Sequence, residues 1–171
     1  ESKIGQSISY SNLAEVYMDQ GEYSKALNTL KLSSNIAKNT NDIVGKIFNM
    51  ETTAAIMLKQ KKYFEAEEEL NKAMATRLEN GINADIDVLY NLFGTLHMKQ
   101  GMDSIATDYY KQSIETTENI RNNLLMESYK TDYMSNKIQS YSKLIISLLN
   151  INKKAEAFDY LERMKARSLL D

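Results

Sequence analysis

Apolar residues recur along this chain at helical spacing, in segments that short polar turns separate. In the first segment they fall at Ile8, Leu13, Val16 and Tyr17, and after polar residues 19–22 they resume from Ala26. Apolar positions three and four residues apart predict amphipathic helices. Continued along the chain, the pattern predicts eight helices, at about 2–20, 23–39, 43–60, 63–79, 84–100, 103–121, 123–151 and 154–170.

The pattern repeats itself at an offset of 40 residues. Self-similarity at such a period predicts a solenoid of stacked helix pairs. Small residues are expected where the helices cross closely, because larger side chains would overpack the contact. Large residues are expected to fill the space between helices. The small residues are Ala14, Ala54 and Gly94 in first helices and Ala26, Ala66 and Ala106 in second helices; the large ones are Tyr10, Leu13, Tyr17, Leu30 and their equivalents.

The turns follow the same repeat. Gly21, Lys61 and Gly101 occupy one position in three copies, where a left-handed residue is expected to end the first helix. Polar turns between copies are predicted at 41–42 and 80–83, and a last turn is predicted at 152–154.

The fourth copy is displaced. Its alanine, Ala157, follows Ala106 by 51 residues instead of 40. The eleven extra residues (51 minus 40) amount to about three helical turns, which keeps the apolar face in phase. One long helix is therefore predicted through Tyr129, Tyr133 and Tyr141. The predicted repeats are about 2–40, 42–80, 83–121 and 123–170, in a single array over 1–171.

Composition removes several kinds of site from consideration. The chain has no cysteine and no proline, a formal net charge of −2 and a single histidine, His97. These exclude a disulfide, argue against a zinc site and provide no basic surface for nucleic acid. No run of about 18 apolar residues predicts a membrane span. We expect no catalytic residue, cofactor or metal, and we interpret His97 as a hydrogen-bonded core residue.

Two segments of the first copy resemble the tetratricopeptide repeat: 12–17 (NLAEVY) and 21–27 (GEYSKAL). The resemblance implies an all-α fold, a right-handed α-solenoid of about four antiparallel helix pairs. The chain departs from the family in its period, 40 residues instead of about 34, and in lacking the proline that usually closes a repeat. Longer repeats of this kind look like those of kinesin light chain and related peptide-binding scaffolds.

That resemblance implies a function in binding a peptide or protein along a concave groove lined by the first helices. Asn12 and Asn91 resemble the asparagines with which longer-repeat relatives hold a peptide backbone. The clamp with which co-chaperones of the family bind an acidic chaperone tail is absent, and the mixed groove argues against a strongly acidic ligand. The candidate groove residues are Asn12, Glu15, Asp19, Glu51, Thr52, Lys59, Asn91, Thr95, Lys99, Gln139 and Lys143.

The end of the chain, 155–171 (AEAFDYLERMKARSLLD), resembles the segment that joins such arrays to CHAT domains, which are caspase-like peptidase domains of bacterial proteins. This resemblance implies a non-catalytic regulatory module, with a following domain packed on helix 154–170 and with Leu169 and Leu170 partly exposed. A plainer interpretation of the basic residues near the end is a helix terminus favoured by the macrodipole.

Two alternatives stay open. One is the sensor array of a bacterial signalling or transcriptional regulator, and the other is a free-standing assembly scaffold. The expected compartment is the cytoplasm, with the periplasm left open because the chain begins at Glu1 and not at a methionine.

Overall fold

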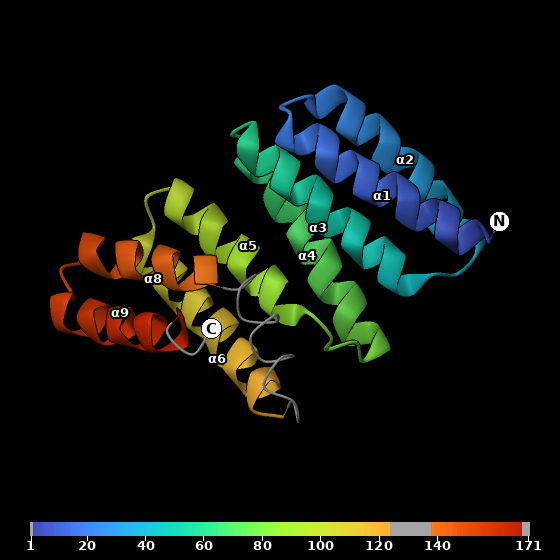
Figure 1. The fold of residues 1–171 in the computed structure, drawn as a ribbon. Coiled ribbons are helices and arrows are strands. Elements are labelled where there is room, and N and C mark those ends of the chain that lie inside the picture. Colours follow the sequence, from blue (N-terminus) through green and yellow to red (C-terminus); the bar gives the residue numbers. More distant parts are fainter. Residues whose placement is uncertain (1, 124–137, 169–171) are drawn as a thin grey trace. The chain divides into compact units, whose positions relative to one another are not determined.

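The computed structural model describes residues 2–123 and 138–168, and every regular element in these ranges is an α-helix (Figure 1). Seven helices lie within two residues of their predicted bounds. The eighth, α8, is described from Ile138; the rest of the long helix predicted over 123–151, with Tyr129 and Tyr133, lies outside the described residues. The helices are α1 (Lys3–Asp19), α2 (Tyr23–Asn39), α3 (Ile43–Lys59), α4 (Tyr63–Asn80), α5 (Ile86–Lys99), α6 (Asp103–Asn123), α8 (Ile138–Asn150) and α9 (Lys154–Ser168).

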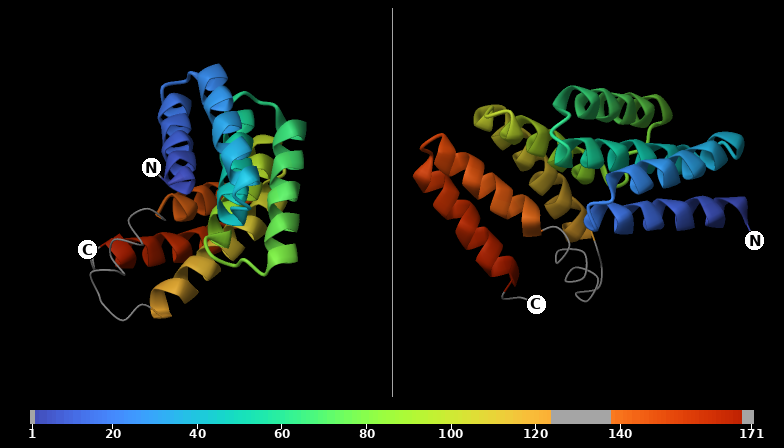
Figure 2. Two further views of the ribbon diagram at one scale, coloured as in Figure 1. Left: turned by 90° about the vertical axis from the view of Figure 1, so that its right-hand side faces the viewer. Right: turned by 90° about the horizontal axis from the view of Figure 1, so that it is seen from above.

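The chain divides into two compact units, Glu1–Asn83 and Ala84–Asp171. In the first unit α1 packs on α2, α3 packs on α4, and α2 also packs on α3. In the second unit α5 packs on α6, α8 packs on α9, and α6 also packs on α8. Figure 2 shows from two further sides that the two helices of each pair run in opposite directions. The fold is thus an all-α solenoid type built from antiparallel helix pairs, while the single array over 1–171 stays a prediction.

The four turns within pairs have one geometry. The second residue after each first helix is left-handed: φ is 77° at Gly21, 62° at Lys61, 76° at Gly101 and 61° at Asn152. The next amide then donates to a carbonyl five residues back, as Glu22 N does to Tyr17 O at 2.8 Å. This closure satisfies carbonyls that the helix end leaves free. The turn predictions are confirmed, including the use of lysine where the other copies have glycine.

The small residues are buried where the sequence predicts close crossings. Ala14, Ala26, Ala54, Ala66 and Ala106 have no exposed surface. Gly94 is the most constrained of the set, because a Cβ added there would lie 2.6 Å from the ring of Tyr110. Tyr110 is itself fully buried and takes the place of Leu30 and Leu70 in the first two pairs. The larger side chain of Tyr110 is therefore accommodated by a glycine where the other pairs have alanine.

One packing prediction is wrong. Leu13 is 41% exposed, although it was expected to fill the space between helices. At the equivalent place in the third pair, Phe93 is covered by the stacked ring of Tyr109, with centroids 5.0 Å apart. The first pair has only the smaller Thr29 in the position of Tyr109, so Leu13 is left without this cover.

Replacing Gly94 by alanine is expected to lower the free energy of unfolding by about 1–3 kcal/mol, because the added methyl meets the buried Tyr110 ring. Urea denaturation measures the change. In the Tyr110→Leu background the same replacement should be tolerated, as it is in the natural Ala54 and Leu70 pair. The matched control is Gly5→Ala in the exposed part of α1, where the new Cβ has room and should stabilise by about 0.5–1 kcal/mol. Equal effects of the two glycine replacements would contradict the account.

Candidate interaction surface

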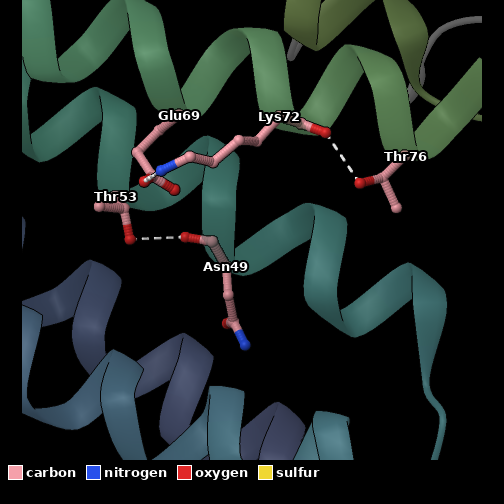
Figure 3. A network of polar contacts seen from close by, with 5 residues as sticks. All are labelled: Asn49, Thr53, Glu69, Lys72 and Thr76. Atoms are coloured by element: carbon pink, nitrogen blue, oxygen red, sulfur yellow. Dashed lines mark hydrogen bonds and ion pairs between the residues drawn. The ribbon is translucent and has the colours of Figure 1, made fainter.

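A cluster of polar side chains lies inside the first unit, where α1, α2 and α3 meet. Ser11 Oγ donates to Asn49 Oδ1 at 2.8 Å, and Asn49 Nδ2 donates to Ser33 Oγ at 2.9 Å. The two serine oxygens are 2.8 Å apart, and all three residues are buried. Figure 3 shows the Asn49 side chain pointing from α3 toward the blue helices α1 and α2, while its carbonyl accepts from Thr53 Oγ1 at 2.7 Å. The hydrogen bonds therefore join three helices.

The second unit contains an equivalent cluster with two residue types exchanged. Ser11, Ser33 and Asn49 correspond to Asn91, Ser113 and Ser140 once the 80-residue offset and the eleven extra residues of the fourth copy are counted. Asn91 Nδ2 donates to Ser140 Oγ at 2.6 Å, and the oxygens of Ser113 and Ser140 are 3.5 Å apart. In the second unit the asparagine of the cluster, Asn91, is thus on the first helix, α5. In the first unit the asparagine, Asn49, is on the third helix, α3.

This exchange leaves the amide oxygen of Asn91 available to another donor, and Lys143 of α8 uses it. Lys143 Nζ donates to Asn91 Oδ1 at 2.7 Å and to Thr95 Oγ1 at 3.1 Å. Thr95 Oγ1 in turn donates to Asn91 O at 2.9 Å and accepts from Tyr110 Oη at 3.3 Å. Three of the predicted groove residues, Asn91, Thr95 and Lys143, therefore form one hydrogen-bonded cluster across two first helices. We call this group the Lys143 cluster.

The ammonium group of Lys143 is partly buried, and the polar groups of the second unit replace only part of its hydration. Burial lowers the pKa of Lys143, and the charge of nearby Lys99 lowers this pKa further. Lys143 forms no ion pair with any carboxylate of the described residues. Its two acceptors are neutral oxygens, which stabilise an ammonium less than a carboxylate does.

The first unit has an apolar groove on the face of its first helices. A cavity of about 280 Å³ lies between α1 and α3, and Asn12 is one of the residues that line it. Its apolar lining includes Ile8 and Val44, which are 53% and 64% exposed. A larger opening of about 500 Å³ lies on the other side of this unit, between α2 and α3, and contains Asn35 but none of the predicted groove residues.

The remaining predicted residues divide between the surface and the interior. Asp19 and Lys59 are exposed, with Lys59 Nζ 3.8 Å from Asp19 Oδ1. Burial, together with the charge of Asp19, raises the pKa of Glu15. Gln139 is exposed on α8.

Glu51 and Thr52 were expected to line the open groove. Both are instead buried within the first unit. Arg77 Nη2 donates to Glu51 Oε1 at 2.8 Å, and Thr52 Oγ1 donates to Phe48 O at 3.0 Å. The carboxylate therefore neutralises a buried guanidinium of α4, and removing either group would leave the charge of the other buried without its counter-ion.

The sequence analysis missed four buried polar residues of the two clusters, Ser33, Asn49, Ser113 and Ser140. Each is a polar residue at a position that the repeat places toward neighbouring helices, and that register is the signal that could have found them. His97 also differs from its interpretation. It stacks on Tyr109 at 5.4 Å, but its buried Nδ1 has no hydrogen-bond partner among the described residues.

Residues 2–123 and 138–168 hold neither a metal-binding cluster nor a membrane-spanning helix. Within these ranges no three histidine, cysteine, aspartate or glutamate side chains are grouped so that they could hold a metal ion. None of the helices described there combines the length and apolar character needed to cross a membrane.

Comparisons with known proteins agree with the helix-pair geometry. Residues 8–38, which form most of the α1–α2 pair, match the family model described as tetratricopeptide repeat. No curated protein matches the sequence. The crystal structure of BtubC (BKLC) from P. vanneervenii is similar over 99% of this chain, with a TM-score of 0.76 and 17% sequence identity. The chain spans 65% of the length of that protein's chain. At this identity the likeness shows the fold, an α-solenoid of helix pairs.

The lowered pKa of Lys143 predicts a pH dependence. Between this lowered pKa and the ordinary lysine value of about 10.4, the unfolded chain binds more protons at Lys143 than the folded chain does. The free energy of unfolding therefore rises with pH in that window. Relative to a Lys143→Met variant, the natural chain should gain stability as pH rises through the window and should show no pH-dependent difference below it. Urea denaturation of both proteins from neutral to alkaline pH measures this, and a relative stability that falls with pH would contradict it.

Proposed function

We propose that this chain is a non-catalytic protein–protein interaction module whose first helices bind a peptide or protein partner. The Lys143 cluster is the observation that supports the proposal most. It brings together predicted groove residues of α5 and α8, and it presents a charge with no opposite partner among the described residues. The match of residues 8–38 to the tetratricopeptide repeat, a unit that commonly binds proteins, supports it further.

The first unit offers a complementary chemistry. The groove between α1 and α3 combines exposed apolar side chains with the amide of Asn12. An amide both donates and accepts, so it can pair with the backbone of an extended peptide. Apolar side chains of the same peptide would bury Ile8 and Val44, which are otherwise left in water.

In its wider setting the module is proposed to regulate a following CHAT-type peptidase domain. The support is the resemblance of 155–171 to the junction that precedes such domains. Lys111 of α6 forms an ion pair with Glu156 of α9, so a change in the α5–α6 pair has a route to the last helix. Leu169 and Leu170, the expected contacts of that domain, lie outside the described residues. A sensor array in a bacterial regulator and a free-standing scaffold are the alternatives.

A selection of peptides from a random library on the immobilised chain, followed by calorimetry of the selected peptides, tests the proposal. For a peptide that binds the first unit, Asn12→Ala is expected to weaken binding about five- to tenfold, the loss of one good hydrogen bond. The matched control is Asn35→Ala, because Asn35 lies at the opening between α2 and α3.

Two results would count against this function. One is that Asn35→Ala weakens binding more than Asn12→Ala does, which would move the binding surface to the second helices. The other is that no peptide is selected at all under conditions in which the chain is folded.

A further inference from the structure

The ammonium group of Lys143 has one donor left over. An ammonium has three N–H donors, and Asn91 Oδ1 and Thr95 Oγ1 accept two of them. Neither acceptor is charged, and no described carboxylate forms an ion pair with Lys143. Burying an ammonium without an acidic partner is costly, because the unpaired charge loses hydration without a Coulombic return.

A second positive charge lies close to the first. Lys99, at the end of α5, is near enough to lower the pKa of Lys143, and no acidic group is among the causes of that pKa shift. Two like charges disfavour each other, so this arrangement destabilises the free unit. An anion placed between the two side chains would reverse the sign of the interaction.

The fold does not require a lysine at this place. The equivalent residues of the other three copies are Asn12, Thr52 and Leu92, which are uncharged. In the first unit, moreover, the amide oxygen of the corresponding cluster accepts from Ser11. In the second unit Asn91 has exchanged places with the serine, and its oxygen accepts from Lys143 instead. The exchange positions the lysine, and structural need alone does not explain a charge there.

We propose that Lys143 and Lys99, with Asn91 and Thr95 holding Lys143 in place, bind one carboxylate of a peptide partner. The inference rests on the proposed function, because it names the chemistry that this same surface recognises. The carboxylate takes the remaining Lys143 N–H and is attracted by the charge of Lys99. It belongs either to an aspartate or glutamate side chain or to the free C-terminus of the partner. One such contact agrees with a groove that is otherwise mixed in character.

The test uses NMR spectroscopy of the full chain with small probes, so it does not need a selected peptide. N-acetylglutamate N-methylamide carries only a side-chain carboxylate, and N-acetylalanine carries only a main-chain one. Saturable shifts of the Lys143 Cε and Asn91 side-chain amide signals are expected with one or both acids. The glutamine counterpart and the methylamide of N-acetylalanine, which lack the charge, should produce none.

Two variants make the assignment specific. Lys143→Met should weaken the binding of the responding acid about tenfold or more, the size expected for a hydrogen bond to a charged group. Leucine at the equivalent place of the third copy shows that an uncharged side chain suits the fold. The control Lys154→Met removes an exposed lysine of the same unit and should leave the affinity unchanged.

Three results would overturn the inference: equal responses to charged and uncharged probes, equal effects of the two lysine variants, and tighter binding of inorganic phosphate than of either carboxylate. These outcomes are separate from a failure of the proposed function. If the chain binds the small acids through Lys143 but selects no peptide, the carboxylate site stands and the proposed peptide-binding function fails. If the chain selects peptides and Lys143→Met does not affect their binding, the proposed function stands and the carboxylate site at Lys143 fails.

Discussion

Ala14 and Ala26 lie in one buried cluster between α1 and α2, and alanine or glycine takes both places in the second and third pairs. In the fourth pair only the second helix keeps the alanine, Ala157, and Ile145 takes the place of Ala14. The small side chains let the two helices of a pair approach closely, and the space around the crossing then decides what else fits. Where the third pair carries Tyr110, its partner position has no side chain at all. Because interiors are packed as densely as crystals, this close crossing sets the register of every other contact in the pair.

The polar clusters add a second constraint on that register. A buried serine or asparagine without a partner costs about 1–3 kcal/mol, so Ser11, Ser33 and Asn49 stabilise only the arrangement in which all three meet. A helix that rotated or slid by one residue would leave these groups unpaired. Apolar contacts tolerate such shifts more easily, since they have no direction. In the second unit the equivalent polar cluster also positions Lys143, through the amide oxygen of Asn91. Hydrogen bonds that the fold requires thus also hold the lysine that we propose binds a carboxylate.

The sequence predicted the helices, turns and small crossings well, because each depends on local pattern and on the repeat. It placed Asn91, Thr95 and Lys143 among the residues of a peptide groove; the structure joins the three through hydrogen bonds, and their part in binding stays a prediction. The polar interior was not predicted, because asparagine and serine on a helix are usually exposed and only the neighbouring helices decide otherwise. Glu51 was misplaced for the same reason, since its burial depends on Arg77, which lies 26 residues away on α4. The exposure of Leu13 depended on a residue of the partner helix, Thr29, that pattern alone does not weigh.

The account depends most on a lysine that is kept charged and partly buried without an acidic partner. Its most direct test is a titration of the Lys143 side chain by NMR spectroscopy in the free chain, following the Cε signal from neutral to alkaline pH. The account predicts a pKa below the ordinary lysine value of about 10.4, because burial and Lys99 both disfavour the ammonium form. A pKa at or above that value would mean that Lys143 is well hydrated or already paired, and it would contradict the account.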